Sequence, residues 1–252
     1  MTPWTQLFDL AGRTALVTGS SRGIGKAIAR ILGQAGAKVF VHGSRPSEAL
    51  DATLAEFREL GLEVEGCYAD IGDSAANRRL AEEVGPVDIL VLNASLQYKT
   101  KWSEIDAEQF ASQVNTNLRS SIELIQGFAP AMLAKQWGRI VIVGSVNQDR
   151  QHPDMAVYAA TKSAGLNLCQ NLARQFAPAG VTVNNLAPGV IDTDRNVAAL
   201  ANPVYRQKVL DKIPAGIIGD PEDCAGLALT LCSAAGRYIT GQNIYVDGGM
   251  TL

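Results

Sequence analysis

The sequence predicts an α/β protein built on a doubly wound parallel sheet with helices on both faces. Short apolar runs rich in Val and Ile alternate with helical patterns from Thr14 onward, which is typical of repeated β-α-β units. A glycine-rich turn separates the first apolar run from the first helical pattern. Because 252 residues with 47% hydrophobic content can bury one large core, and no linker interrupts the pattern, we expect a single domain over residues 1–252.

Strands are predicted where runs of β-branched and apolar residues lie between turn residues. These runs cover residues 13–18, 38–42, 64–68, 88–92, 139–144, 181–186 and 243–246. Helices are predicted between the strands, where apolar residues recur at helical spacing. They cover residues 23–35, about 47–60, 74–84, 107–133 and about 155–176.

Capping residues mark several helix ends. Gly36 follows the first helix as a C-terminal cap. Asp220 starts the last helix, with a proline at the first helical position and acidic residues in the first turn. Asparagine, proline and glycine are scattered between residues 190 and 219, so this segment is predicted as a loop with a short helix. A connection of this length is typical of a lid over a binding site.

Composition narrows the range of partners and locations. A net charge of -3, a pI near 5.5 and no basic run longer than two residues give no basis for binding nucleic acid or an acidic membrane surface. The four cysteines form no Cys-x-x-Cys pair, so no metal site is expected. The first ten residues lack the pattern of a signal peptide, and no apolar run approaches the roughly 20 residues of a membrane span. We therefore expect a cytoplasmic protein with reduced cysteines.

A serine, a tyrosine and a lysine stand at a spacing that suits proton transfer during hydride transfer. Tyr158 and Lys162 are four residues apart in the predicted helix 155–176, so they share a face. An ammonium near the phenol would lower its pKa from about 10 and let it act as an acid or base near neutral pH. Ser145 follows a predicted strand, where its hydroxyl suits a carbonyl oxygen. Taken alone, these residues also fit an ordinary amphipathic helix and an ordinary turn.

A glycine-rich segment follows the first strand and opens the first helix. Backbone amides and a helix N-terminus here form a site that suits a pyrophosphate. The glycine spacing differs from the common Gly-x-Gly-x-x-Gly fingerprint, and a glycine-rich turn by itself also serves close helix packing. The strand before the segment, the helix after it and the Ser-Tyr-Lys trio together favour cofactor binding here. The segment reads Thr18-Gly19-Ser20-Ser21-Arg22-Gly23-Ile24-Gly25.

The end of the second strand indicates which dinucleotide binds. Sites for NAD place Asp or Glu there, where the carboxylate accepts hydrogen bonds from the ribose hydroxyls. This chain has His42-Gly43-Ser44-Arg45 instead. Arg45, the Ser44 hydroxyl and Arg22 of the glycine-rich loop suit a 2′-phosphate, so NADP is favoured over NAD. The alternative is that Arg45 is a solvated loop residue and that both cofactors bind.

Together these segments resemble the short-chain dehydrogenase/reductase family over nearly the whole chain. Its motifs Tyr-x-x-x-Lys with an upstream serine, and Thr-Gly-x-x-x-Gly-x-Gly, are present here. The resemblance implies a Rossmann-type fold and hydride transfer between a nicotinamide and a carbonyl carbon. Tyr158 would donate or remove the proton, Ser145 would orient the oxygen, and Lys162 would tune Tyr158 and reach the ribose. A fourth catalytic residue would anchor a proton-relay water: Asn117, with Asn115 as its rival, because only one of the two can face the site.

The same resemblance implies further cofactor contacts. Asp70-Ile71 matches the adenine pocket of the family, and Asn93-Ala94 matches the start of its Asn-Ala-Gly motif. Ser95 departs from that motif by replacing the glycine, which leaves the backbone less free. A later segment matches the part that contacts the nicotinamide, with Thr193 placed for the carboxamide. It reads Pro188-Gly189-Val190-Ile191-Asp192-Thr193.

The substrate stays open between classes. Within the family the chain is similar to 3-oxoacyl-(acyl-carrier-protein) reductases, but Gln136 and Ala179 stand where those enzymes hold the acidic carrier with basic residues near the active-site entrance. Carrier-protein binding is therefore doubtful. The polar residues 147–150, directly after Ser145, suit a sugar or polyol, or else form a solvated loop. Two other classes of protein are rivals to the enzyme: a dinucleotide-binding sensor without chemistry, and a structural homo-oligomer with a vestigial pocket. In either class the presence of the Ser-Tyr-Lys trio would be accidental.

Two helices carry surfaces that favour assembly. The resemblance implies that they pair with their copies across a two-fold axis, and that a second two-fold near residues 243–246 gives a homotetramer. A charge placed at Ile125 is then expected to dissociate the tetramer. The alternative is that these apolar residues are buried in the core of a monomer. The residues concerned are small ones on the helix 155–176 (Ala159, Ala160, Ser163, Ala164 and Asn167) and apolar ones on the helix 107–133 (Leu118, Ile122, Ile125 and Phe128).

Overall fold

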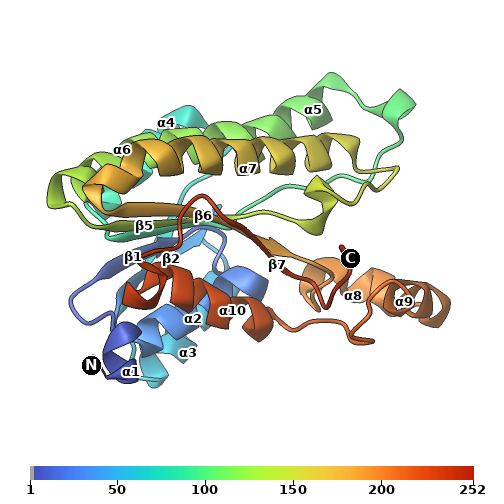
Figure 1. Ribbon diagram of the computed structural model, residues 1–252. Coiled ribbons are helices and arrows are strands. Elements are labelled where there is room, and N and C mark those ends of the chain that lie inside the picture. The colour runs from blue at the N-terminus through green and yellow to red at the C-terminus, as the bar shows by residue number, and fades with distance from the viewer. Residues whose placement is uncertain (1–2) are drawn as a thin grey trace.

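The computed structural model describes residues 3–252, and seven parallel strands form one sheet in this range (Figure 1). All seven predicted strands are present, with ends shifted by one or two residues. Residues 1 and 2 of the expected domain lie outside the described part. The strands are β1 (Thr14–Val17), β2 (Lys38–Gly43), β3 (Val64–Tyr68), β4 (Ile89–Leu92), β5 (Gly138–Val143), β6 (Val181–Pro188) and β7 (Asn243–Val246).

The order across the sheet is β3-β2-β1-β4-β5-β6-β7, and every neighbouring pair is parallel. The chain winds outward from β1 in one direction and, after β3, from β4 in the other. Strand order therefore reverses between β1 and β4, and loops leaving the carboxyl ends of these two strands diverge there. In open α/β sheets this is where ligands bind. The predicted doubly wound Rossmann-type sheet is confirmed.

Helices cover both faces of the sheet (Figure 1). One layer, drawn above the sheet, holds α4 (Ser74–Val84), α5 (Ala107–Val114), α6 (Ser120–Lys135) and α7 (Ala156–Phe176). The other, drawn below, holds α1 (Trp4–Leu7), α2 (Gly23–Gln34), α3 (Glu48–Glu59) and α10 (Pro221–Cys232). Two further helices lie beyond the carboxyl ends of the strands, at the right of the view: α8 (Asp194–Leu200) and α9 (Pro203–Leu210).

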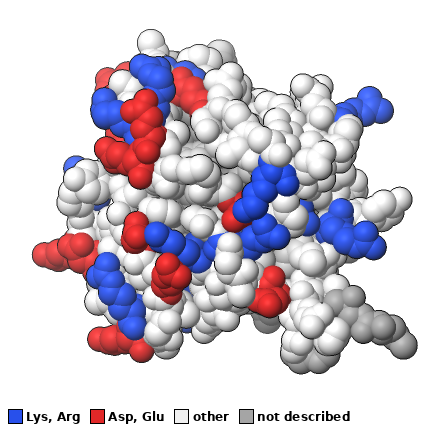
Figure 2. All heavy atoms as spheres, turned by 90° about the vertical axis from the view of Figure 1, so that its left-hand side faces the viewer, with Lys and Arg blue, Asp and Glu red and all other residues white. Residues whose placement is uncertain are grey.

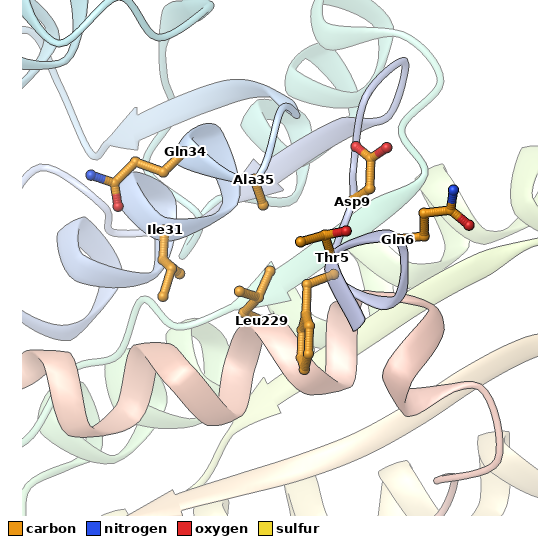
Figure 3. Close-up of a pocket in the computed structure, with 8 residues that line it drawn as sticks. Thr5, Gln6, Asp9, Ile31, Gln34, Ala35 and Leu229 are labelled. Atoms are coloured by element: carbon orange, nitrogen blue, oxygen red, sulfur yellow. The ribbon is translucent and has the colours of Figure 1, made fainter. Parts of the chain in front are cut away.

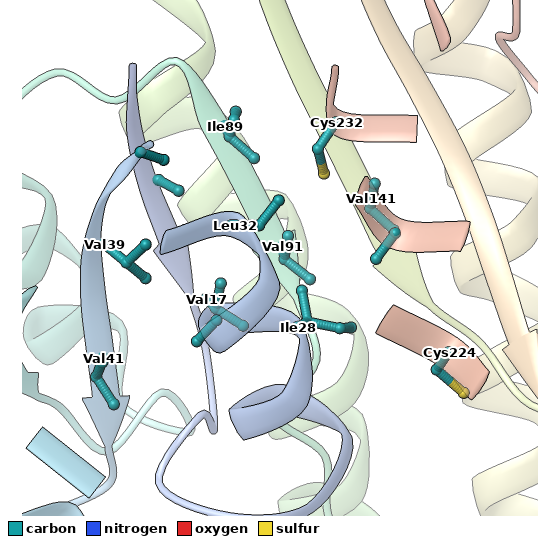
Figure 4. Close-up of a cluster of buried hydrophobic side chains, with 14 of the residues drawn as sticks. Val17, Ile28, Leu32, Val39, Val41, Ile89, Val91, Val141, Cys224 and Cys232 are labelled. Atoms are coloured by element: carbon teal, nitrogen blue, oxygen red, sulfur yellow. The ribbon is translucent and has the colours of Figure 1, made fainter. Parts of the chain in front are cut away.

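The sheet divides the buried apolar side chains into two clusters, because successive residues of a strand point to opposite faces. Val17 and Val91 face α2, α3 and α10, whereas Leu16 and Leu90 face α4, α6 and α7. Figure 4 shows the first cluster, in which Ile28 and Leu32 of α2 lie over strand valines. Each fully buried aliphatic side chain contributes about 1.5–3 kcal/mol. This packing fixes the strand ends that carry the site.

The structure corrects two predicted segments. The continuous helix expected over residues 107–133 is interrupted by one turn of π-helix, η2 (Asn115–Arg119), between α5 and α6. The segment 190–219, expected to hold one short helix, holds two. The start of α9 could have been predicted from the sequence. Asn202 is its N-cap and accepts the Tyr205 N–H through its side chain, and Pro203 occupies the first helical position.

Short 3₁₀ turns complete the described chain: η1 (Trp102–Glu104), η3 (Val146–Gln148), η4 (Ala177–Ala179) and η5 (Ala234–Gly236). The predicted start of α10 is confirmed, with Pro221 as its first residue and Asp223 Oδ2 accepting the Asp220 N–H at 2.7 Å. Across residues 3–252, no helix has both the length and the hydropathy needed to cross a membrane.

Candidate active site

The serine, tyrosine and lysine of the trio meet at the carboxyl end of β5. Ser145 directly follows Gly144 at the end of this strand, and its hydroxyl accepts the Asn147 N–H at 3.2 Å. Tyr158 and Lys162 lie in the first two turns of α7, whose N-terminus points toward the same end of the sheet. All three residues are buried. The Lys162 ammonium lies 5.6 Å from the centre of the Tyr158 ring.

Lys162 is held by the sheet rather than by the phenol. Its ammonium donates to the Val143 carbonyl at 2.7 Å. Burial, together with the smaller effect of the positive charge of Arg195, lowers the pKa of Lys162 to about 7. An ammonium has three N–H donors, so a cofactor ribose hydroxyl beside it would be an additional partner to the Val143 carbonyl.

The pKa of Tyr158 departs from the expectation that Lys162 would lower it. Burial raises the pKa of the phenol, and this effect outweighs the opposing influence of the Arg195 charge and of the neighbouring Ser145 and Ser95 side chains. The phenol is therefore neutral at pH 7 and ready to donate a proton. The cation that acts on it most is Arg195, a residue that sequence analysis did not nominate.

Asn117 lies in the π-helical turn η2 and is buried. Its side-chain oxygen accepts the Leu96 N–H at 2.7 Å, and its amide donates to the Leu96 carbonyl at 2.8 Å and to Thr161 Oγ1 at 3.1 Å. Thr161 in turn donates to the carbonyl of Tyr158 at 2.7 Å. Asn117, and not Asn115, thus joins the loop after β4 to the catalytic turn of α7. π-Helical turns are frequent at functional sites.

The glycine-rich loop is braced against the end of β4. Thr18 Oγ1 accepts the N–H groups of Asn93 and Ala94 at 3.0 and 3.1 Å, and Asn93 Nδ2 donates to the carbonyls of Thr18 and Gly19 at 2.9 and 3.0 Å. Gly19 has a positive φ of 63°, and a Cβ on Gly25 would collide with the Gly19 carbonyl and the Asn93 amide. Only glycine lets the loop pass this close to β4.

The glycine-rich loop leaves the N-terminus of α2 without a side-chain cap. Gly23 begins α2 with a φ of 57°, and the Arg22 side chain makes no capping hydrogen bond to the helix. The first-turn amides of α2, which include those of Ile24 and Gly25, are thereby left directed toward the crevice. Ser21 anchors the outer side of the loop, since its carbonyl accepts from Thr53 Oγ1 at 2.9 Å.

His42 links three strands beneath this loop. Its Nδ1 accepts the Gly19 N–H at 3.1 Å, so Nε2 carries the proton and donates to the Ala69 carbonyl at 3.1 Å. Burial lowers the pKa of His42 to about 4, so the imidazole is neutral at pH 7. Sequence analysis used only the residues next to His42 to predict the cofactor. The feature that could have singled out His42 was its place as a lone histidine at the end of an apolar strand.

The other residues expected at the cofactor follow the carboxyl ends of β2 and β3 or lie in the glycine-rich loop. Ser44 and Arg45 are exposed after β2, and in the described residues no ion pair holds Arg45. Arg22 pairs with Asp194 of α8 at 3.7 Å. Asp70 is exposed after β3 and accepts the Gly72 N–H, while Ile71 packs in the core.

The segment after β6 is anchored from both sides. Pro188 ends β6 beside Val246, and Ile191 forms a bridge with Gly219. Thr193 stands at the N-cap of α8, and its methyl group lies 3.3 Å from where a Cβ on Gly23 would be. Gly189 and Val190 connect these points. This segment therefore lies against the glycine-rich loop at Gly23.

A contact from α8 to the loop after β4 was missed by sequence analysis. The Arg195 guanidinium donates to the Ser95 carbonyl at 2.9 Å and lies 3.3 Å from its hydroxyl. Nearby, the Lys99 ammonium lies 5.9 Å from the ring centre of Tyr205 in α9. The segment 190–219 thus closes on the loop after β4 through two cations. Ser95, noted only as a departure from the family glycine, supplies one of these contacts.

The polar residues 147–150 do not form a joint sugar-binding surface. Gln148 is buried and hydrogen bonds with Asn185 and Asn243, and Arg150 donates to the Met250 carbonyl. Asn147 points its amide at the sulfur of Met155. Of the four, only Asp149 is exposed. Of the residues that could face a sugar or polyol, Gln148 is thus used inside the protein.

The helix surfaces expected in an assembly are partly internal. Ile125 and Phe128 are 4% and 1% exposed and belong to the core between α6 and the sheet. A charge at Ile125 would therefore disrupt the subunit itself, so this variant cannot report on assembly. Ile122 is 38% exposed and Phe110 of α5 is 53% exposed. On α7, Ala160, Ser163 and Asn167 are exposed small residues.

Gln136 and Ala179 lie at the amino ends of β5 and β6, at the opposite end of the sheet from Tyr158. Within one chain they are not at the active-site entrance. Figure 2 shows this side of the molecule, where acidic and basic side chains are intermixed. It offers no continuous basic field for an acidic carrier protein.

A separate hollow of about 420 Å³ lies between α1, α2 and α10 (Figure 3). Ile31, Ala35 and Leu229 form its apolar wall, and Asp9 contributes its only titratable side chain among the described residues that line it. The Asp9 carboxylate already accepts the Ala11 N–H at 2.9 Å. The hollow lies on the far side of the molecule from α8 and α9 and shares no residue with the trio (Figure 1).

The crevice at the reversal of strand order and the buried trio beside it define an oxidoreductase that interconverts a CH–OH group and a carbonyl group. The chain belongs to the short-chain dehydrogenase/reductase family, since the family model described as enoyl-(acyl carrier protein) reductase matches residues 19–251. A 3-oxoacyl-[acyl-carrier-protein] reductase of Vibrio cholerae is 37% identical, with 96% of this chain and 98% of the relative covered.

Two solved structures represent the two kinds of relative. A 3-oxoacyl (acyl-carrier-protein) reductase from Agrobacterium tumefaciens C58 with NADP bound is 40% identical, with a TM-score of 0.94 and 98% and 97% of the two chains covered. A gluconate 5-dehydrogenase from Burkholderia cenocepacia in complex with NADP and tartrate is 33% identical, with a TM-score of 0.92 and 98% of each chain covered. The reaction class is therefore clear, whereas relatives of similar identity divide between acyl and sugar-acid substrates.

Proposed function

We propose that this chain is an NADPH-dependent oxidoreductase that interconverts a ketone and a secondary alcohol. The observation that carries the proposal is the buried Tyr158 phenol at the carboxyl end of β5, with the Ser145 hydroxyl beside it and Lys162 one helical turn away. The test is NADPH oxidation that depends on an added ketone. A sensor or a structural protein with a vestigial pocket would bind the dinucleotide without turnover.

Each residue of the site has a role in this proposal. The nicotinamide, when bound, supplies or accepts a hydride. In the reducing direction the carbonyl carbon gains that hydride and its oxygen gains the proton of Tyr158, which gives the alcohol. Ser145 orients the oxygen by donating a hydrogen bond, and Lys162 holds the ribose and adds positive charge near the phenol. Asn117 holds the Leu96 backbone and anchors the water that returns a proton to Tyr158.

NADP is the proposed cofactor because of the groups after β2. Ser44 and Arg45 project into solvent there, and Arg22 is held only by a weak exposed pair with Asp194. Two guanidiniums and a hydroxyl suit a 2′-phosphate, while no carboxylate stands at the end of β2 to accept from ribose hydroxyls. NADP in the relatives' structures supports the assignment.

Replacing Arg45 with alanine is expected to weaken NADPH binding about 10-fold and NADH binding hardly at all, because only NADPH carries the 2′-phosphate. Fluorescence titration with each cofactor measures the effect. Arg58, in the last turn of α3, provides a matched control in R58A. Equal losses for both cofactors in R45A would show that Arg45 does not read the phosphate.

Two substrate classes remain candidates, and the carrier-bound one is the weaker. The relatives include 3-oxoacyl-(acyl-carrier-protein) reductases, but Gln136 and Ala179 are uncharged and lie at the opposite end of the sheet from Tyr158, so they give no support for carrier binding within one chain. Small oxo or hydroxy compounds, including sugar derivatives, are the second class. A panel of ketones, ketoses and 3-oxoacyl thioesters with NADPH separates the two.

We also propose that residues 1–252 form one domain and that the segment 190–219 acts as a lid over the substrate. The segment 190–219, with α8 and α9, contacts the loop after β4 through Arg195 and Lys99 and so covers the substrate side of the crevice. Opening this segment would admit substrate, and closing it would exclude water. The cytoplasmic location stays a prediction.

A homotetramer is the proposed assembly, with α5, α6 and α7 at one two-fold interface. Replacing Ile122 with glutamate is expected to reduce the mass of the particle while leaving the fold intact, because its side chain is exposed in the subunit. Light scattering at micromolar concentration measures it: wild type should have about four times the 26.7 kDa of one chain. A wild-type mass near 26.7 kDa would refute the assembly.

A further inference from the structure

The substrate side of the crevice contains a guanidinium without an acidic partner. Arg195 lies in the first turn of α8 and reaches Ser95, where it contacts one carbonyl and one hydroxyl, both neutral. The nearest acidic residue in sequence, Asp194, pairs with Arg22 instead. In residues 3–252 no carboxylate forms an ion pair with Arg195.

The Ser95 contacts leave part of the guanidinium for a ligand. They use the two terminal nitrogens, and a guanidinium has five N–H donors in one plane. Its plane is fixed by a carbonyl oxygen at 2.9 Å and a hydroxyl oxygen at 3.3 Å. A fixed guanidinium fork is the group that binds a carboxylate with two parallel hydrogen bonds.

The position of Arg195 beside the trio says where such a carboxylate would lie. Arg195 holds Ser95, and the next residue, Leu96, donates to Asn117, whose amide also donates to Thr161 in the turn of α7 that carries Tyr158 and Lys162. Lys99 adds a further cation on the same loop as Ser95. Arg195 thus brings positive charge to the loop that borders the trio, which favours an anionic substrate.

Ser95 and Arg195 are also complementary in residue type. The loop after β4 reads Asn93-Ala94-Ser95 where the family motif has glycine in the third position, and the added hydroxyl is one of the groups that hold the guanidinium. A serine here supplies what a glycine would not. The two residues are 100 positions apart and meet only when the segment 190–219 lies on this loop.

We propose that Arg195, held by Ser95, binds a carboxylate of the substrate, so that the enzyme acts on a hydroxy acid or oxo acid rather than on a neutral ketone or thioester. This inference rests on the proposed function, since it names the substrate class of the same site. In the reducing direction the oxo acid gains a hydride from NADPH at the carbonyl carbon and the Tyr158 proton at its oxygen, giving a hydroxy acid and NADP⁺. The carboxylate takes no part in bond changes.

The test compares oxo acids with their methyl esters, which keep the reacting carbonyl and remove the charge. Oxo acids with the ketone at positions 2 to 5 are each paired with the ester, and kcat/KM with NADPH is measured for both. Wild type should prefer the acid by about 100-fold in the pairs that turn over, the size expected for a charge-assisted, two-pronged contact. Preference for esters, or equal values, would overturn the inference.

Variants assign the preference to Arg195. R195M should reduce the ratio of acid to ester about 10- to 100-fold, and R195K should keep part of it, because a single ammonium replaces the fork. S95G should lower the ratio as well. R206M changes the same charge on the exposed face of α9 and should keep the wild-type ratio. An unchanged ratio in R195M with a normal circular dichroism spectrum would assign the preference elsewhere and contradict the inference.

The two proposals fail in different ways. If NADPH binds but no acid, ester or other ketone is reduced, the oxidoreductase assignment itself fails. If neutral ketones and thioesters are reduced at least as well as acids, the oxidoreductase assignment holds, and the proposal that Arg195 binds a substrate carboxylate is wrong.

Discussion

Replacing Tyr158 with phenylalanine is expected to lower kcat by about 10²- to 10⁴-fold while NADPH binding stays nearly intact. The substitution removes the hydroxyl that exchanges a proton with the substrate oxygen and keeps the ring in its buried place in α7. The measurement is steady-state NADPH oxidation with a reactive ketone, together with fluorescence titration of NADPH. Retention of wild-type turnover by Y158F would rule out the proposed acid.

The pH dependence gives a second readout of the same group. Burial raises the pKa of Tyr158, so the phenol keeps its proton at neutral pH. Reduction needs the protonated phenol, so its rate should fall as the pH rises through the phenol pKa, and oxidation should show the opposite trend. Y238F, which alters a tyrosine that is 96% exposed, is the matched control and should keep the wild-type profile.

Replacing Gly25 with alanine is expected to weaken NADPH binding about 10- to 100-fold, since the loop must move and a hydrogen bond to a charged phosphate contributes about 1.5–3 kcal/mol. The added methyl group would collide with the Gly19 carbonyl and the Asn93 side chain. Both are part of the brace between the glycine-rich loop and β4. The unfolding free energy should also fall, by about 1–3 kcal/mol, because a packed site is overfilled.

Gly226 provides the control for this substitution. It lies in α10 with nothing within 4 Å of the place where a Cβ would be. G226A should bind NADPH normally and be slightly more stable, since alanine favours a helix over glycine by about 1 kcal/mol. Calorimetric titration and thermal unfolding of both variants measure the contrast. Normal NADPH binding in G25A would show that the loop does not need its close approach to β4.

The parts of the site that sequence could predict are those encoded within one element. Tyr158 and Lys162 lie four apart in a single helix, and the glycine-rich loop joins one strand to the next helix, so local periodicity and spacing are enough. The central strands β1 and β4 were equally readable, because they are buried and have continuous apolar runs.

The parts that could not be predicted depend on contacts between distant segments. The π-helical turn around Asn117 has no periodicity of its own; its side chain is held by Leu96 and Thr161, from two other elements. The Arg195 contact likewise needs α8 to lie against Ser95. The expected effect of Lys162 on the phenol was wrong because burial cannot be weighed against charge without the packing of the helix.

Because β1 lies between β2 and β4, the first four strands form a contiguous half-sheet whose pairing needs no residue beyond Leu92. A ribosome adds about 5–20 residues per second, so this dinucleotide-binding half can assemble seconds before Ser145 and Tyr158 exist. During that interval the apolar strand β4 has no partner on its outer side, where β5 will later pair. An unpaired strand edge is a template for association with other chains. The synthesis of α5 and α6 is therefore the period in which the nascent chain most needs protection by chaperones.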